Sequence, residues 1–313
     1  MARMTRRACT MHDVRRQVTH FSRHMYNHLR VTSMRRRRCW QLAVVPALVA
    51  SLAIASSAAA HDFWLIPDLF SVSADSNVHV NGRSCLRFPH GAAVQPARIA
   101  AARIIGAASD TKITEMAVEG TSLRLHAKPA VSGQYLIAVA LTPRTTRSTP
   151  MGLLRYLRAE GGAAEAARLE RENAFAGMDS VVYGGASYAF TVVQVGRAGP
   201  RAFSKTAGFP LEFVPVNDPT HVHLGDTLHV KVLGAGKVVP GITIDAVPAS
   251  DSTDAATAAA PSLVADASGV VHVPLTKAGP WVIRSAFVVR RNGTAKEMDV
   301  ARSTYVFNVG TKH

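Results

Sequence analysis

The chain has 313 residues, 48% of them hydrophobic, and its 36 basic against 21 acidic residues would suit a nucleic-acid ligand. Eleven of the arginines but only one aspartate precede residue 61, so the remainder carries 25 basic and 20 acidic residues. A net charge of +5 without a compact basic stripe argues against nucleic acid as a partner.

The first 60 residues resemble a leader. A basic block at 35–38 is followed by an apolar run at 42–54 and by small residues ending at 58–60. This order predicts a signal peptide at 34–60, cleaved after Ala60, and export to the periplasm. An uncleaved anchor is the alternative, but the apolar run is short for a membrane span, so we expect no transmembrane segment after cleavage. Met34 is as suitable a start as Met1, and residues 1–33 are left out of the fold prediction.

The rest of the chain divides into three parts. Short alternating segments between turn residues predict an N-terminal β domain at 61–145. Residues 146–207 are first rich in Ala, Leu, Arg and Glu and predict two helices, 151–160 and 163–175, followed by a linking strand. Six or seven further strands predict an immunoglobulin-like β-sandwich at 208–313. The predicted fold class is all-β, with two immunoglobulin-like β-sandwich domains joined by a short helical segment.

Known catalytic motifs are missing from the sequence. It contains no G-x-S-x-G, H-E-x-x-H, P-loop or dinucleotide-binding pattern. We therefore expect a binding protein and not an enzyme.

Nine histidines follow the leader. Three of them, His79, His229 and His272, alternate with apolar residues and are predicted to face solvent. His61 differs, because cleavage after Ala60 would give it a free α-amine beside its ring Nδ1. These two nitrogens chelate one ion, and a further imidazole completes a three-nitrogen site that suits Cu(II), Ni(II) or Co(II).

The best source of that imidazole is the segment NDPTHVHLGD. In an extended chain His221 and His223 project to the same face, and Asp218 is placed to orient one ring. We predict that His61, His221 and His223 bind a divalent nickel, cobalt or copper ion. The alternative for the H-x-H segment is a polar strand edge, and the sequence does not determine whether His61 reaches it.

Several motifs together resemble a known family. They are AHDFWLIP, LRYLRAEG, RLEREN, LEFVPVNDP and DASGVVHVPLTKAGPWVIRSAF, in this order. The chain thereby resembles the periplasmic proteins grouped as domain of unknown function 4198, and this resemblance implies a β-rich protein associated with nickel and cobalt uptake. Of the candidate ligands only His61 follows from this resemblance, since it stands where the family has a histidine after the signal; His221 and His223 follow from their spacing alone. The segment ENAFAGMDSVVYGG departs from the family's more basic run, and no membrane helix follows, so a transporter subunit is not expected.

Three hypotheses about function remain. The leading one is a periplasmic metal-binding protein that delivers its ion to a membrane metal-uptake complex. The second is a non-catalytic structural or interaction module of the envelope without metal, suggested by the long polar loop at 248–262. The third is a copper oxidase that uses the N-terminal histidine, which would require redox activity.

Overall fold

The computed structural model describes residues 62–312 except 86, 251–261 and 291–296. The described residues belong to one compact unit. The leader, His61 and most of the loop predicted at 248–262 lie outside the described residues. Within the part of the chain that is described, no helix is long and apolar enough to cross a membrane.

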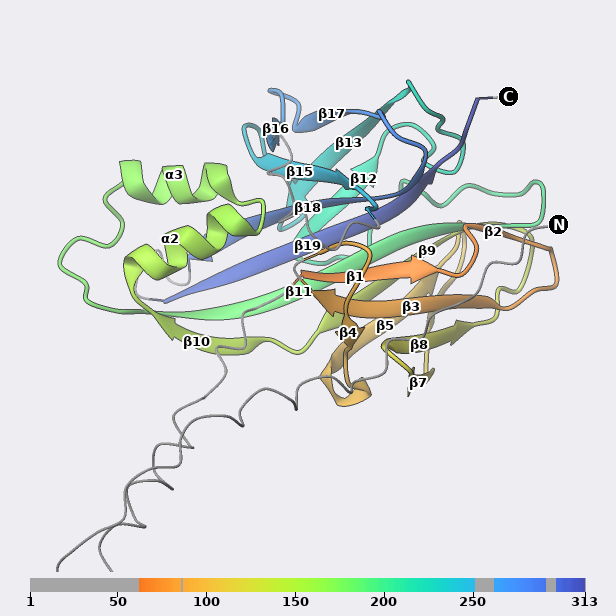
Figure 1. Cartoon of the computed structure of the whole chain (residues 1–313), viewed down its shortest axis with the longest axis horizontal. Coiled ribbons are helices and arrows are strands. Elements are labelled where there is room, and N and C mark those ends of the chain that lie inside the picture. The colour runs from red at the N-terminus through yellow and green to blue at the C-terminus, as the bar shows by residue number, and fades with distance from the viewer. Residues whose placement is uncertain (1–61, 86, 251–261, 291–296, 313) are drawn as a thin grey trace, which may run out of the picture. The chain divides into compact units, whose positions relative to one another are not determined.

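A ten-stranded sheet extends through the fold (Figure 1). In spatial order its main strands are β16 (Ser262–Val264), β15 (Thr243–Pro248), β18 (Gly279–Arg290), β19 (Glu297–Val309), β11 (Val181–Val195), β9 (Gly133–Leu141), β5 (Ile99–Ile105) and β6 (Asp110–Lys112). Two shorter strands, β10 (Arg144–Ser148) and β2 (Ser71–Val72), also pair with β11. Two smaller sheets complete the β structure.

The smaller sheets cover opposite faces of the large one. The five-stranded sheet contains β1 (Asp62–Pro67), β3 (Val78–Cys85), β8 (Ser122–Ala127), β7 (Glu115–Glu119) and β4 (Ala92–Ala93). The four-stranded sheet contains β12 (Leu211–Pro215), β13 (Thr227–Gly234), β14 (Lys237–Val238) and β17 (Val270–Pro274). A short 3-10 helix, η1 (Pro96–Arg98), precedes β5.

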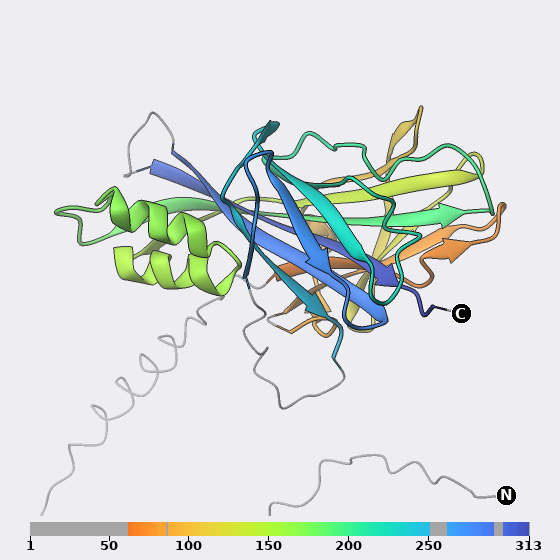
Figure 2. The same ribbon diagram turned by 90° about the horizontal axis from the view of Figure 1, so that it is seen from above.

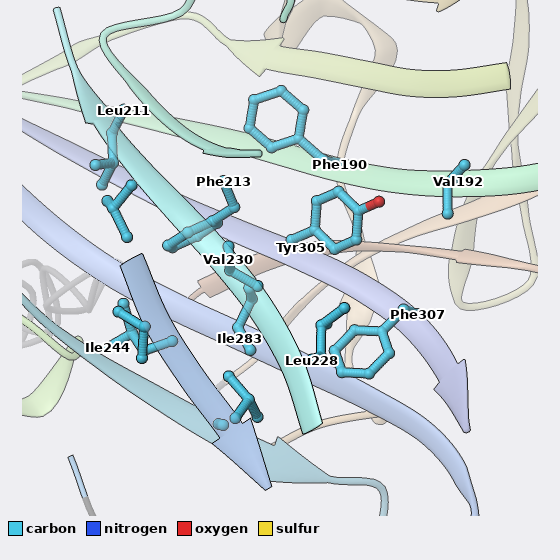
Figure 3. Packing of buried hydrophobic residues seen from close by; sticks show 14 of the residues in the cluster. Phe190, Val192, Leu211, Phe213, Leu228, Val230, Ile244, Ile283, Tyr305 and Phe307 are labelled. Carbon is cyan, nitrogen blue, oxygen red and sulfur yellow. The ribbon is translucent and has the colours of Figure 1, made fainter. Parts of the chain in front are cut away.

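Strand β9 shows why both faces of the large sheet are buried. Leu136 and Ala138 pack into the core between the large sheet and the four-stranded sheet. Figure 3 shows part of this core. Tyr135 and Ile137 alternate with them and pack into the core beneath the five-stranded sheet. All nine residues of β9 are buried, and from Leu136 to Leu141 the strand is continuously apolar instead of alternating.

Strand β11 joins the two sandwiches. Its 15 residues span about 50 Å, enough to pair with β10 and β9 along one edge and with β19 in parallel along the other. This is the linking strand predicted within 146–207. The predicted mostly-β fold with a short helical segment is confirmed, and the two sandwiches share the large sheet.

Helices α2 (Pro150–Ala159) and α3 (Ala163–Arg171) pack together against one end of β11, β18 and β19 (Figure 2). Thr149 caps α2 by accepting a hydrogen bond from the backbone N–H of Gly152, and Pro150 occupies the first turn. Leu154 and Leu157 are buried as predicted, but Met151 is 55% exposed. The second helix ends four residues before the predicted boundary at 175.

Candidate functional site

His221 and His223 lie in the loop between β12 and β13. Val222 between them is only 4% exposed and packs into the core, so its two neighbours project away from the core. Both histidines line a cavity of about 980 Å³ together with Gln194 and Arg197. The two predicted ligands therefore line the same cavity.

Asp218 orients the first of these rings. Its Oδ2 lies 3.2 Å from His221 Nδ1, and the same carboxylate accepts hydrogen bonds from Thr220 and Gln134. Burial opposes ionisation, but the hydrogen bonds from Thr220 and Gln134 hold the pKa of Asp218 below its usual value. A charged Asp218 favours a proton on Nδ1 of His221, which leaves Nε2 as the ligand nitrogen.

The start of β1 lies far from this loop. His61 is outside the described residues, but Phe63 is described and its carbonyl accepts a hydrogen bond from Thr304 of β19. His223 pairs with Gly310, six residues further along the chain from Thr304. Six extended residues span about 20 Å. The described residues therefore give no support to a site shared by His61 with His221 and His223.

Each of the three histidines that were predicted to face solvent lies opposite another histidine, and the fourth member of the two pairs is His126. His229 of β13 lies directly opposite His272 of β17, and their Nδ1 atoms are 2.6 Å apart. His79 of β3 lies opposite His126 of β8 with an Nδ1–Nδ1 distance of 2.8 Å. In both pairs the ring planes are inclined at 82°.

Each pair has a carboxylate behind one ring. Asp266 Oδ2 lies 3.5 Å from His272 Nε2, and Glu119 Oε1 lies 3.7 Å from His126 Nε2. Several hydrogen bonds, the strongest from the Ser268 side chain, lower the pKa of Asp266 to about 2. Asp266 is therefore a carboxylate at neutral pH. A carboxylate facing Nε2 favours the proton there and leaves Nδ1 as the basic nitrogen.

The Nδ1–Nδ1 distance in each pair is that of a hydrogen bond, in which one ring donates its proton and the other accepts it. Two imidazole nitrogens bound at 2.0–2.1 Å and at right angles about an ion are about 2.9 Å apart. The observed 2.6 and 2.8 Å are shorter than that value, so a pair would have to lose its shared proton and reorient both rings to bind one ion. Among the described residues, no group of three or more His, Cys, Asp or Glu side chains is arranged to hold a metal. Each pair would thus supply two ligands, and solvent the others.

A buried ionic cluster lies at the start of β1. Asp62 is 3% exposed and accepts a hydrogen bond from Arg284 Nη1 at 2.7 Å, and Arg284 Nη2 lies 3.3 Å from Asp245. Glu160 at the end of α2 is also buried and is hydrogen-bonded to Asp62. Burial and the adjacent Asp62 raise the pKa of Glu160 to about 10, so its carboxyl is neutral at pH 7.

Glu160→Gln is expected to stabilise the protein most at high pH. In the unfolded chain Glu160 ionises above its ordinary pKa of 4.5, whereas the folded protein keeps it protonated to about pH 10. Stability therefore falls between these pH values, and an amide removes this loss. Urea denaturation should show a gain in stability at pH 8 and none at pH 4. Glu170→Gln on the surface serves as the control, and an equal gain at both pH values would contradict the argument.

The fold and the histidines define a β-rich protein with solvent-facing imidazole pairs. The chain belongs to the family described as domain of unknown function (DUF4198), whose model matches residues 58–288. A search of curated protein sequences gives no match.

The chain also shows weak likeness to solved structures. The adhesin InvE of Yersinia pseudotuberculosis is 12% identical with a TM-score of 0.18, over 78% of this chain and 58% of that chain. Murine CEACAM1b is 11% identical with a TM-score of 0.19, over 80% of this chain and 99% of that chain. Scores this low carry no argument about function.

Proposed function

We propose that this protein is exported to the periplasm, where it binds a divalent nickel, cobalt or copper ion and delivers it to a membrane metal-uptake complex. The observation that carries the proposal is the His229–His272 pair, with its Nδ1 atoms 2.6 Å apart and Asp266 behind the second ring. His79 and His126 repeat this arrangement on another sheet.

The proposed sites are open ones. The side chain of His272 is 56% exposed, so an ion bound there keeps solvent ligands that another protein can replace. Such exchange suits delivery better than permanent storage. It also distinguishes these pairs from a structural metal site, in which the protein supplies every ligand.

The residues predicted from the sequence stay in the proposal as separate sites. The amine and ring of His61 form a chelate that needs no second loop. His221, oriented by Asp218, and the neighbouring His223 offer imidazoles to an ion in the cavity that they line.

A titration tests the histidine pair. Calorimetry of the metal-stripped protein beginning at His61 is performed with Ni(II) and Cu(II). We expect the double variant His229→Ala, His272→Ala to lose one class of sites or to bind at least about tenfold more weakly there, since both nitrogens are lost. His90→Ala removes an exposed histidine outside both pairs and should leave binding unchanged. Identical titrations of the double variant and the wild type would refute this site.

The same titration separates the N-terminal chelate from the pair. One extra glycine before His61 removes the free amine next to the imidazole and leaves His229 and His272 intact. We expect this extension to weaken only the N-terminal site. An unchanged titration would remove His61 from the proposal without affecting the pair.

A further inference from the structure

A second cavity, of about 440 Å³, lies between β10, β11, β19, α2 and the edge of the five-stranded sheet. We call it the arginine pocket, after Arg98, Arg144 and Arg302, which line it from η1, β10 and β19. Its other polar lining side chains are neutral: Ser84, Gln95, Thr145, Thr146, Tyr156, Tyr183 and Ser187. No carboxylate is among the described residues that line it.

The floor of the arginine pocket is built and buried. Arg302 is 7% exposed, and its Nη2 donates a hydrogen bond to Ser187 Oγ at 2.5 Å. The guanidinium also lies over the ring of Tyr156, 5.6 Å from its centroid. Tyr156 stacks on Tyr183 with a centroid distance of 6.0 Å, and this pair gives the pocket a rigid aromatic wall.

Two of the three guanidinium groups, those of Arg98 and Arg144, have no carboxylate partner among the described residues. Arg302 differs from them, because its Nη1 lies 3.8 Å from Oε2 of the buried Glu160. Partial burial, then the charges of Arg144 and Arg302, lower the pKa of Arg98. The three like charges therefore repel one another, and an anion would relieve the repulsion.

We infer that the arginine pocket binds a small organic molecule through an oxyanion group, a carboxylate or a phosphate. A guanidinium presents a planar fork of donors that matches either group in a bidentate manner. Two such forks, from Arg98 and Arg144, stand beside an aromatic wall with the positive charge of the buried Arg302 behind it, and this arrangement suits a compact anion with some apolar surface. The volume lies within the range of small-molecule sites.

The experiment uses the metal-stripped mature protein, so that a chelating anion cannot bind through a metal ion. Citrate and inorganic phosphate are titrated separately by calorimetry, as the carboxylate and the phosphate probe. We expect the wild type to bind at least one of them, more weakly as salt is raised. Citrate binding alone would identify a carboxylate site, and phosphate binding alone a phosphate site.

A double variant, Arg98→Gln with Arg144→Gln, tests the residues. Both lie at the rim and not in the core, so the fold should be kept, which circular dichroism checks. We expect at least about tenfold weaker binding, because two charge-assisted contacts are lost. Arg155→Gln makes the same change on the exposed side of α2, outside the pocket, and should bind as the wild type does. Failure of the wild type to bind either probe at millimolar concentration, or equal affinity of the double variant, would overturn the inference.

Discussion

Arg284→Met is expected to destabilise the folded protein by about 3–5 kcal/mol, because it leaves buried carboxylates without their cation. The guanidinium of Arg284 is the counter-ion of Asp62, 2.7 Å away, and of Asp245, 3.3 Å away. The side chain of Arg284 is 15% exposed and that of Asp62 only 3%, so water cannot replace the contact. Urea denaturation at pH 7 measures the change in the free energy of unfolding.

Two further variants separate burial of charge from loss of packing. Adding Asp62→Asn and Asp245→Asn to Arg284→Met removes the uncompensated charges and should restore most of the lost stability. Arg158→Met breaks a surface ion pair with Glu170 and should cost less than about 1 kcal/mol. A loss of under about 1 kcal/mol for Arg284→Met itself would show that the cluster does not stabilise the fold.

Trp64→Ala is expected to destabilise the protein by about 3–5 kcal/mol through the cavity it creates. Trp64 is 1% exposed, meets Phe88 edge to face at 5.6 Å, and packs against Val282 of β18 and Val306 of β19. It therefore fastens the first strand of the five-stranded sheet to the large sheet.

Denaturation of Trp64→Ala beside Leu69→Ala tests this role. Leu69 lies near the end of the same strand but is 62% exposed, and its truncation should change stability by less than about 0.5 kcal/mol. An equal fall in the free energy of unfolding for both variants would mean that the burial of Trp64 does not stabilise the fold. Phe63 and Trp64, the aromatic residues of the first strand, thus anchor that strand in the core.

The alternation of apolar and polar residues in the sequence predicted those strands that bury only one face. In β13, which reads TLHVKVLG, Leu228, Val230 and Val232 are buried and alternate with more exposed residues. The same patterns could not identify the shared sheet, because β9 and β11 are buried on both faces and their neighbours come from distant parts of the chain. A strand's period gives its faces but not its partners.

The sequence likewise predicted the contacts between neighbouring residues of the candidate sites but not those between residues distant in the chain. Asp218 and His221 are three residues apart, and the sequence predicted their contact. His229 and His272 are 43 residues apart and meet only through the pairing register of β13 and β17. The sequence therefore predicted that each faces outward but missed that they face each other. The arginine pocket is lined by residues as far apart in the chain as Arg98 and Arg302, so no local sequence pattern could have predicted it.

Nitrogen-15 NMR of the imidazoles tests the proposed metal binding most directly, because it identifies the ring nitrogen that binds. Zn(II) serves as a diamagnetic probe that also binds imidazole at 2.0–2.1 Å. Added to the metal-stripped protein, it should shift the Nδ1 signals of His229 and His272 and leave the Nε2 of His272 protonated towards Asp266. Unchanged signals from both rings, or coordination through Nε2, would contradict the account.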